Sequence, residues 1–496
     1  MTETEARSGE RLEATAMMNT LTPREVVMGG TMTERVRNIK VRSNSRVVQR
    51  FKTLGLPLPK HLNGLFSEVR NQPDTHYRPA RGQGMLNFED PDPDPSRHGI
   101  SPKTSLQFEV SSLSAIGLVN AGLDVQVFEA ASTFGQVGAG VAIVLTRTHQ
   151  PKPTQFLFNF LAGTNDEQIF HYFESSGGKN SEGVGVYRPA FLEALMPLLD
   201  PKHVQFNKRC TSVERLSSGR YFLRFDDGTS HETDLVIGAD GIRSVIRKDV
   251  VGENSGERLG FSGMYAYRGL IPIDILKAAG VKTDIEQPLG WLGAGKHIIT
   301  FPIRDNKILN VVAFLNPHNN IELLPERPLP WAEVRDSQEV VDGYSDWEGD
   351  GKIIASHLEN PSRWSIHTLY PPLESFVKDR VVLVGDAAHG MLPHLGAGVG
   401  QGFEDVYTLC RLLGHPRTNK NSLDVALAIY DEIRAPRANM VLERSIKMGR
   451  IFDGYGTLYD KEEMRAGLRG MYEPIWDHDL MAEVDVALQR LDKEVN

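Results

Sequence analysis

Cysteine is nearly absent from this chain. Its 496 residues include only two, Cys210 and Cys410, which lie far apart in the sequence. A secreted fold built on disulfides needs more of them, and neither has the spacing of a metal ligand or a redox pair. Long apolar runs are also missing, because no stretch approaches the roughly 18 residues that are needed to span a bilayer. The sequence therefore predicts a globular fold without a disulfide framework or a membrane span.

Positive charge is not concentrated anywhere either. The formal net charge is -9 at pH 7 and no long basic run occurs, which argues against a nucleic-acid partner. The segment from Met1 to Glu10 is polar and acidic, unlike a secretory signal. The remaining composition, 40% hydrophobic and 24% charged, is ordinary for globular proteins. We therefore expect a soluble cytoplasmic protein of two or three domains.

The first hundred residues differ from the rest. They contain Pro-Asp-Pro-Asp-Pro at 91–95 and many scattered charges. Such composition favours loose order, and only a short helix around Arg35 to Leu54 is expected there. Residues 1–104 are therefore predicted to be an N-terminal extension of low order.

Ordered α/β structure is predicted from Ala115 onward. A helix continues from Ala115 to Ala121, Gly122 ends it, and Leu123 to Phe128 forms a strand that ends in Glu129. A second buried strand ends at Asp240-Gly241, after a hairpin whose turn is at Asp227-Gly228. Another helix is expected from Tyr187 to Leu199, with a proline in its first turn.

Residues Val381 to Gly402 carry the most informative pattern. Four apolar residues predict a short buried strand that ends at Gly385-Asp386, and a glycine-rich loop then opens a helix. That helix places Val399, Phe403, Val406, Cys410 and Leu413 along one face. A strand, a glycine-rich loop and a helix N-terminus together suit a phosphate-bearing or electron-rich ligand. An ordinary turn, whose glycines serve only the backbone, is the alternative.

The remaining segments complete the predicted architecture. Residues 257–375 are rich in strands and resemble an antiparallel sheet inserted into an α/β domain, whereas the chain after Asp424 is mostly helical. The predicted domains are an extension at 1–104, a cofactor-binding domain at 105–256 and 376–423, a sheet domain at 257–375 and a helical region at 424–496.

Several polar residues have both a functional and a structural interpretation. Glu129 suits an acid that binds a ribose at the end of a strand, or an acid that faces water. Arg243 and Arg247, which follow Asp240-Gly241, suit phosphate contacts or solvated positions in a first helical turn. Arg268, within a strand-like segment, suits either a structural ion pair or a carboxylate or phenolate in a cavity.

Three further basic residues are candidates for the site. Arg188 begins the predicted helix after Tyr187, where it suits a clamp on a cofactor or a surface charge. His389 and His394 stand five residues apart without an obvious carboxylate partner. They form a poor metal site, so we expect them to line a loop rather than bind metal.

Taken in order, these motifs resemble one family. The chain from about 115 to 490 is similar to the salicylate-hydroxylase-like FAD-dependent aromatic hydroxylases, which are group A flavoprotein monooxygenases, and most nearly to fungal members. The matching blocks end in Glu129, Ile143, Arg188, Ser244, His394, Arg437 and Asp479. The resemblance implies a Rossmann-like FAD-binding domain, an inserted and mainly antiparallel substrate sheet, and a helical C-terminus.

The resemblance also implies roles for particular residues. Glu129 would bind the adenosine ribose, Ala142 would lie along the FAD, and Arg188 would contact the cofactor. Asp386 would hold the ribityl chain, and the loop up to Val399 would present backbone N–H groups and a helix N-terminus to the isoalloxazine. Asp240-Gly241 would lie near the pyrophosphate of FAD and near the incoming NAD(P)H.

The implied reaction is hydroxylation of an electron-rich aromatic ring with NAD(P)H and O2. The substrate would be a small aromatic or polyketide-like molecule. Some fungal relatives use an arginine that matches Arg268, together with a tyrosine whose place is taken here by Phe301. A phenol that could orient a substrate hydroxyl is therefore missing, which argues against the dearomatising variant of the chemistry.

The front of the chain departs from the family. A Gly-x-Gly-x-x-Gly motif is expected about 20 residues before the ribose acid. The segment from Leu106 to Ser114 stands there, contains no glycine and includes Glu109. Residues Val144 to Phe160 likewise replace the expected helix. Two local losses between intact flanks are typical of altered splicing more than of gradual divergence.

Three functional hypotheses follow. The first is an FAD- and NAD(P)H-dependent monooxygenase. The second is a catalytically impaired relative that keeps the fold as a binding protein, which the missing glycines favour and the joint presence of Asp240, Asp386 and Arg268 opposes. The third keeps the flavin for epoxidation or halogenation, but no lysine falls in a halogenase-like motif and the membrane helices of many epoxidases are absent.

Overall fold

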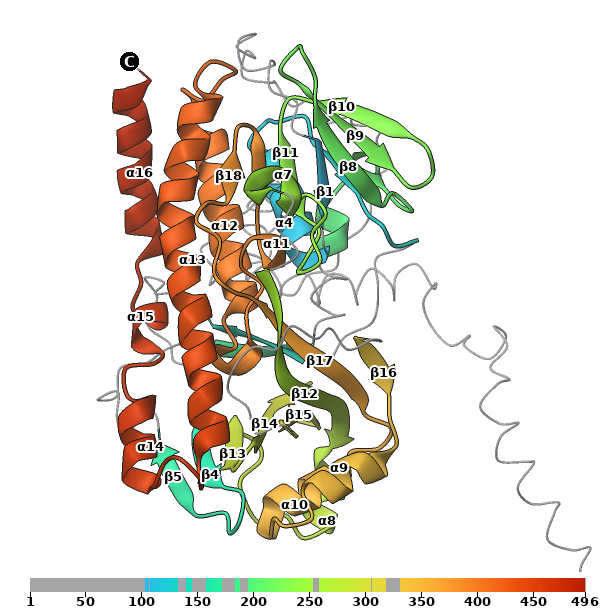
Figure 1. The fold of residues 1–496 in the computed structure, drawn as a ribbon, viewed down its shortest axis with the longest axis vertical. Coiled ribbons are helices and arrows are strands. Elements are labelled where there is room, and N and C mark those ends of the chain that lie inside the picture. Colours follow the sequence, from blue (N-terminus) through green and yellow to red (C-terminus); the bar gives the residue numbers. More distant parts are fainter. Residues whose placement is uncertain are drawn as a thin grey trace, which may run out of the picture.

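The structure is a computed structural model, shown in Figure 1, in which two large sheets lie one above the other and long helices run along one side. The ranges that it describes are 103–106, 108–132, 140–144, 158–171, 183–187, 195–252, 258–304, 306–317 and 331–495. The predicted extension at 1–104, with its helix around Arg35 to Leu54, lies almost entirely outside these ranges.

The first large sheet has six strands in the order β18-β19-β11-β1-β2-β7. Its strands β1, β2, β7, β11 and β19 pair in parallel, and only β18 runs antiparallel to its neighbour. The bounds are β1 Lys103–Leu106, β2 Gln126–Phe128, β7 Val204–Gln205, β11 Val236–Ala239, β18 Val377–Lys378 and β19 Val381–Leu383. All four residues of β11 are buried, as expected for a parallel strand that is covered on both faces.

Two helices pack together against this sheet. Helix α4, Phe108–Asn120, connects β1 to β2, and α12, Gly398–Leu413, follows β19. The predicted stripe on α12 is confirmed, since Phe403, Val406 and Leu413 are buried in the core of this sheet. Two short helices stand near the same strands, α7 Arg247–Val251 and α11 Asp386–His389.

A three-stranded sheet flanks the six-stranded one. It consists of β8 Cys210–Arg215, β9 Tyr221–Phe225 and β10 Ser230–Thr233. The hairpin predicted around Asp227-Gly228 is confirmed, and Tyr221, Leu223 and Phe225 face the core as their alternation requires. Before it, the chain forms 3-10 turns at Met196–Leu198 and Pro201–His203, and residues 188–194 of the predicted helix lie outside the described residues.

The second large sheet has eight strands in the order β16-β17-β12-β15-β14-β13-β4-β5. All neighbours pair antiparallel except β13 and β4, which are parallel. The bounds are β4 Asn159–Ala162, β5 Gln168–His171, β12 Leu259–Pro272, β13 Leu289–Gly293, β14 Lys296–Ile303, β15 Ile308–Leu315, β16 Ala332–Val334 and β17 Ser362–Leu369. Strands β4 and β5 therefore join this sheet, although their residues fall within 105–256, which the sequence assigned to the cofactor domain.

Three short helices cover one face of the eight-stranded sheet. They are α8 Ile273–Ala278, α9 Ser337–Gly343 and α10 Gly349–Ser356. Trp347, between α9 and α10, is buried so closely that a Cβ at Gly163 would lie 2.3 Å from its ring. The side chains of Tyr267 and Val311 are buried with Val340 and Ile354 on this face, so the opposite face is turned toward the six-stranded sheet.

The C-terminal region is helical, as predicted. Helix α13, Leu423–Gly454, has 32 residues and is therefore about 48 Å long, enough to run along both large sheets (Figure 1). It is followed by α14 Lys461–Leu468, α15 Glu473–Trp476 and α16 Leu480–Glu494. Among the described residues, no helix is both long and apolar enough to cross a membrane.

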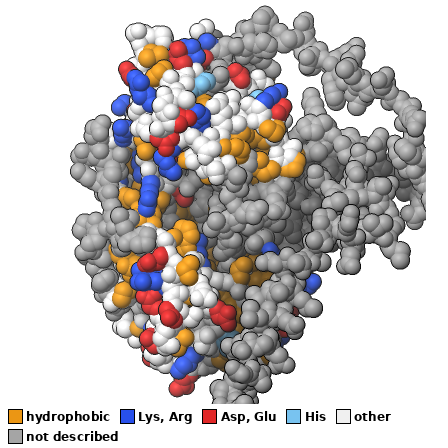
Figure 2. All heavy atoms as spheres, turned by 90° about the vertical axis from the view of Figure 1, so that its right-hand side faces the viewer, with side chains coloured by type: hydrophobic (Ala, Val, Ile, Leu, Met, Phe, Trp, Pro, Cys, Tyr) orange, Lys and Arg blue, Asp and Glu red, His pale blue; other side chains and the backbone are white. Residues whose placement is uncertain are grey.

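The observed architecture confirms the predicted fold class. A mainly parallel sheet with helices is joined to a mainly antiparallel sheet and a helical C-terminus. On the described part of the face in Figure 2, acidic, basic and apolar side chains are interspersed. A small two-stranded sheet, β3 Gly140–Val144 with β6 Gly183–Tyr187, completes the described strands.

Candidate active site

The carboxyl ends of four parallel strands define the candidate cofactor-binding edge. Strands β2, β1, β11 and β19 are neighbours and point the same way, so the segments that follow them meet at one edge of the sheet. These segments carry Glu129 after β2, the start of α4 after β1, Asp240 after β11 and Asp386 after β19. The fold thus brings together residues that are far apart in the sequence.

Glu129 stands at the position that the sequence predicted for a ribose-binding acid. Its side chain is only 9% exposed, and its Oε1 accepts a hydrogen bond from the backbone N–H of Ala131 at 2.9 Å. Burial raises the pKa of Glu129, while the backbone N–H groups of Ala131 and Ala130 oppose that rise. The ribose role itself stays a prediction.

Asp240 shapes the turn after β11. Its Oδ1 accepts a hydrogen bond from Ser244 Oγ at 2.5 Å, and its Oδ2 accepts one from the backbone N–H of Val245 at 2.7 Å. Gly241 has φ of 75°, in the left-handed region that suits glycine. The carboxylate predicted near a pyrophosphate is thus already used to hold its own loop.

Arg247 joins two of these turns. It is 2% exposed, its Nε donates to the Ala387 carbonyl at 2.8 Å, and its Nη2 donates to the Ile242 carbonyl at 2.8 Å. Burial lowers its pKa to about 10. The solvated position considered from the sequence is therefore wrong for Arg247, whereas Arg243 is exposed and lies over the ring of Trp331 at 3.9 Å.

The turn at Gly385-Asp386 is packed closely against α4. Gly385 has φ of 60°, and Asp386 begins α11 with an exposed side chain. A Cβ at Gly402 would lie 2.6 Å from Cγ2 of Val110, and one at Gly385 would lie 3.2 Å from the same atom. Val110, near the start of α4, therefore leaves no room for a side chain at Gly402 and little room for one at Gly385.

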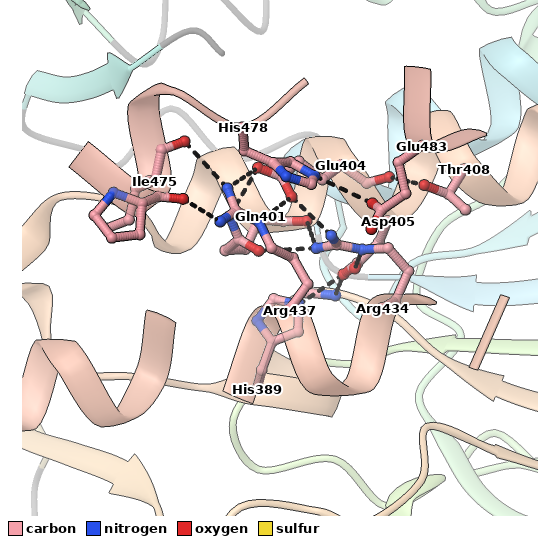
Figure 3. Close-up of polar contacts among 12 residues, drawn as sticks. His389, Gln401, Glu404, Asp405, Thr408, Arg434, Arg437, Ile475, His478 and Glu483 are labelled. Atoms are coloured by element: carbon pink, nitrogen blue, oxygen red, sulfur yellow. Dashed lines mark hydrogen bonds and ion pairs between the residues drawn. The ribbon is translucent and has the colours of Figure 1, made fainter. Parts of the chain in front are cut away.

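A buried charge network contacts this turn, and Figure 3 shows its side chains from His389 to Arg437. Asp405 Oδ2 accepts hydrogen bonds from the backbone N–H of Gly385 at 2.8 Å and from His389 Nε2 at 2.6 Å, and Asp405 Oδ1 lies 2.8 Å from Arg434 Nε. Burial would raise the pKa of Asp405, but His389 and Arg434 outweigh it and leave the pKa below its ordinary value. The sequence had offered no carboxylate partner for His389.

The same network ties α12 to α13. Glu404 Oε2 lies 2.7 Å from Arg434 Nη1, and Glu404 Oε1 lies 3.1 Å from Arg437 Nη2. Arg434 Nη2 also donates to the carbonyl of Gln401 at 3.1 Å. Burial opposes ionisation of Glu404, yet the two guanidinium groups hold its pKa below the ordinary range. These contacts fix the direction in which the N-terminus of α12 points.

The N-terminus of α12 is open. Gly398, Val399 and Gly400 are partly exposed, and Ala397 before them supplies no side-chain cap. The first N–H groups of a helix have no partners within it and carry partial positive charge, so they suit an anionic ligand. The side chain of Val399 packs against the core, so the predicted contact at Val399 would come from its backbone.

Arg268 lies on the face of the eight-stranded sheet that is turned toward this edge. It is half-buried in β12 beside Val312 of β15, which in turn pairs with Ile299 of β14. Val312 and Ile299 are also only partly buried, and they pack in one cluster with Met391 from the loop between α11 and α12. A guanidinium and two apolar side chains therefore line the surface that faces the loop after Asp386.

Phe301 shares that face. It is 5% exposed and packs with Phe158 and Ile303. It supplies apolar surface there and carries no hydroxyl to orient a substrate.

A second buried polar cluster was missed by the sequence. His297 Nδ1 lies 2.9 Å from Asp453 Oδ1, and Asn316 Nδ2 donates to Asp453 Oδ2 at 3.1 Å. The ring of His394, in the loop before α12, lies 5.2 Å from that of His297 between centroids. Burial, together with the neighbouring His297, lowers the pKa of His394 to about 3, so this imidazole is neutral at ordinary pH.

Two predicted cofactor residues lie partly or wholly outside the described residues. Ala142 lies in β3 and pairs with Gly185 of β6, and its side chain lies outside the described residues. Arg188 also lies outside them. Within the described ranges, no group of three or more histidine, cysteine, aspartate or glutamate side chains is arranged to hold a metal ion.

The described residues fit FAD at both of its ends. Glu129 suits the ribose, and Asp386 with the open N-terminus of α12 suits the flavin and its ribityl chain. The turn between β1 and α4 fits the pyrophosphate less well, because it contains no glycine through which the backbone could approach closely. The positive charge of Arg247, buried beneath two of the turns, favours an anion at this edge.

Comparison of the sequence with known families and proteins agrees with this arrangement. Residues 199–445 match the family described as FAD binding domain. The chain is 35% identical over 405 residues to a salicylate hydroxylase of Pseudomonas putida, covering 75% of this chain and 90% of that protein. It is 31% identical over 402 residues to 6-methylsalicylate 1-monooxygenase atA of Aspergillus terreus, covering 74% of this chain and 86% of the relative.

Comparison of the fold with solved structures also finds a salicylate hydroxylase. A solved salicylate hydroxylase substrate complex superposes with a TM-score of 0.67 at 26% sequence identity, covering 79% of this chain and 98% of that chain.

Proposed function

The chain belongs to the salicylate-hydroxylase-like family of FAD-dependent monooxygenases, and on that premise we propose that it hydroxylates a small phenolic aromatic acid with NAD(P)H and O2. The observation that carries the proposal is the position of Arg268, on the surface of the eight-stranded sheet that faces the loop after Asp386. Two relatives are named for salicylate and 6-methylsalicylate, which are both hydroxybenzoates.

The cofactor roles belong to the same proposal. Glu129 holds the adenosine ribose, Asp386 holds the ribityl chain, and the backbone at Val399 faces the isoalloxazine. Ala142 and Arg188 complete the predicted cofactor contacts. When bound and reduced by NAD(P)H, FAD supplies the activation of oxygen, and the protein supplies binding, orientation and a dry environment.

Arg268 acts on the substrate. Its guanidinium presents a planar array of donors that matches a carboxylate in two-point contact, so it fixes one end of an aromatic acid. Val312 and Ile299 offer apolar surface beside it for the ring, and Met391 closes the side nearest the α11–α12 loop. Held in this way, the ring faces the cofactor-binding edge, and apolar neighbours keep water away from the reacting carbon.

The direct test is flavin content and turnover of the full chain. We expect purified protein, after FAD is added, to show an absorbance band near about 450 nm. We also expect it to oxidise NAD(P)H faster when salicylate or 6-methylsalicylate is present, and to give a product that carries an oxygen atom from labelled O2. A protein that binds flavin but never transfers oxygen to either acid would contradict the proposal.

Substitution of Arg268 tests the substrate contact. Arg268→Gln removes a charge-assisted contact worth about 1.5–3 kcal/mol, so kcat/KM for the acid should fall roughly ten- to hundredfold. Arg268→Lys keeps the charge but lacks the planar guanidinium, so its kcat/KM should lie between those of the wild type and Arg268→Gln. Arg224→Gln, an exposed arginine over Phe222 in the hairpin, is the matched control and should leave kcat/KM unchanged.

The turn between β1 and α4 favours a second candidate. A catalytically impaired relative that binds aromatic acids without turnover is consistent with the lack of glycine in the sequence between β1 and α4. Titration with FAD separates the two candidates. An impaired relative would gain no flavin band at saturating FAD, yet would still bind a hydroxybenzoate in calorimetry and lose that binding with Arg268→Gln.

A further inference from the structure

Three exposed apolar side chains surround Arg268. Leu270 is 42% exposed, Trp364 36% and Val334 71%. Single exposed apolar residues are common on protein surfaces, but several gathered around a charged residue are typical of a binding surface. We call Leu270, Val334 and Trp364 the apolar rim.

The sheet register places the whole rim on one face together with Arg268. Arg268 of β12 pairs with Ser362 of β17, and Ser362 pairs with Val334 of β16. Trp364 lies two residues beyond Ser362, and Leu270 lies two residues beyond Arg268. Side chains alternate along a strand with a period of two, so all of these side chains leave the sheet in the same direction.

That face is the substrate-facing one. The opposite face is covered by α8, α9 and α10, against which Tyr267 and Val311 are buried. Following the register inward from Arg268, the next side chains are Val312 and Ile299, which pack with Met391 of the α11–α12 loop. The apolar rim therefore lies on the same sheet face as Arg268, farther from the cofactor-binding edge.

Trp364 is held in place beside the guanidinium. Its Nε1 donates to Ser362 Oγ at 3.1 Å, and Cζ of Arg268 lies 5.3 Å from the centre of its ring. An arginine at this distance over a tryptophan face is attracted by the ring. The indole is thus fixed next to the charge, while about a third of its surface is still open to solvent.

We propose that the apolar rim takes an apolar substituent of the substrate, with Trp364 as its specificity-determining residue. The substrate class is an aromatic acid that carries an alkyl or acyl chain: the acid group pairs with Arg268 and the chain lies over Trp364, Leu270 and Val334. This inference rests on the proposed function and narrows it. Because the rim is open at the sheet edge, chains of several carbons fit better than the bare ring.

The test uses the holoenzyme and a series of hydroxybenzoates with hydrogen, methyl, propyl and pentyl substituents. Each methylene buried on the rim should raise kcat/KM up to roughly fourfold, mainly through KM. Trp364→Ala should flatten this dependence, so that kcat/KM for the pentyl compound divided by kcat/KM for unsubstituted salicylate falls toward one. Trp364→Phe, which keeps an aromatic face, should retain most of the dependence, and Leu270→Ser should weaken it.

The control variant is Ile275→Ser. Ile275 is 50% exposed on α8, on the covered side of the sheet, so its substitution should leave the chain-length dependence intact. A wild-type enzyme with no preference for longer chains would overturn the inference, as would a Trp364→Ala variant with an unchanged slope. Loss of a dimer in Trp364→Ala, with unaltered substrate preference, would instead assign the rim to a second copy of the chain and equally overturn it.

Failure of the proposed function gives a different result. If no hydroxybenzoate is turned over at all, the reaction class is wrong. If salicylate is hydroxylated but the slope is flat, only the role of the rim is wrong.

Discussion

Asp405 accepts a hydrogen bond from the backbone N–H of Gly385 at 2.8 Å. Asp405 belongs to α12, a helix that begins thirteen residues after that glycine. The same carboxylate oxygen lies 2.6 Å from Nε2 of His389. A single buried side chain therefore fixes both ends of the turn that carries Asp386. Arg434 neutralises its charge from α13, so the position of the predicted ribityl contact depends on three helices.

The first prediction concerns this carboxylate. Asp405→Asn leaves the guanidinium of Arg434 without one of its two charged partners in the network, in a side chain that is fully buried. Breaking a buried pair in this way costs about 3–5 kcal/mol, and we expect a loss of unfolding free energy of that order in urea titrations. FAD affinity should fall as well, because the turn is no longer held.

The control for this variant is Asp424→Asn. Asp424 pairs with Arg380 on the surface, where its side chain is 64% exposed. Exposed pairs contribute about 1 kcal/mol or less, so this variant should keep both stability and flavin binding. Equal effects of the two substitutions would refute the structural role given to Asp405.

The second prediction tests the packing between α4 and α12. Gly402→Ala places a Cβ 2.6 Å from Cγ2 of Val110 and should lower the unfolding free energy by about 1–3 kcal/mol. Val110→Ala removes this Cγ2 atom. The double variant should therefore lose less unfolding free energy than the sum of the losses in the two single variants. Strict additivity in this double-mutant cycle would show that the two residues do not touch.

The third prediction concerns acid stability. His394 has a pKa of about 3 in the folded chain, against an ordinary value of 6.5. Between these values the unfolded chain binds one more proton, so stability should fall as pH decreases, by up to about 1.4 kcal/mol per pH unit. In His394→Asn, the unfolding free energy should fall less steeply between pH 6.5 and pH 3, because nearly one proton fewer is taken up on unfolding.

The matched control is Asn421→Ala, an exposed substitution that removes no titratable group. Its slope of unfolding free energy against pH should be the same as in the wild type. Buried carboxylates such as Asp405 also lose stability in acid, so the comparison of slopes, rather than the acid denaturation itself, identifies His394.

The fourth prediction addresses the ribose end. Glu129→Gln removes a charged acceptor and should weaken FAD binding about tenfold, or about 1.4 kcal/mol, in a fluorescence titration. Because burial raises the pKa of Glu129, the wild type should lose FAD affinity on acidification at a higher pH than an ordinary glutamate would produce. Glu214→Gln, on the exposed hairpin, should change neither quantity.

Much of the fold followed from local patterns. The alternation of Tyr221, Leu223 and Phe225 and the apolar spacing along α12 each reflect one buried face of a single element, and the structure confirms both. The motifs ending in Glu129, Asp240 and Asp386 could be brought together as well, because parallel strands end at a common edge.

What the sequence did not reveal depends on partners from distant segments. His389 meets Asp405 from the next helix, and His297 meets Asp453 from a helix more than 150 residues later. No local spacing encodes such pairs. Arg247 illustrates the same limit, because a basic residue in a first helical turn is usually solvated, whereas here it donates to the carbonyl of Ala387, 140 residues later in the chain.

Strand β4 has a consequence for how the molecule folds. It leaves the parallel sheet after β2, inserts beside β13 in the eight-stranded sheet, and the chain then returns to the first sheet at β7. The chain therefore passes from the first sheet to the second and back again, so the two sheets are not formed by two consecutive segments of the sequence. A fragment of residues 257–375 would expose the bare edge of β13, and open edges invite aggregation. We expect unfolding of the intact chain to be a single cooperative event, in which neither sheet survives without the other.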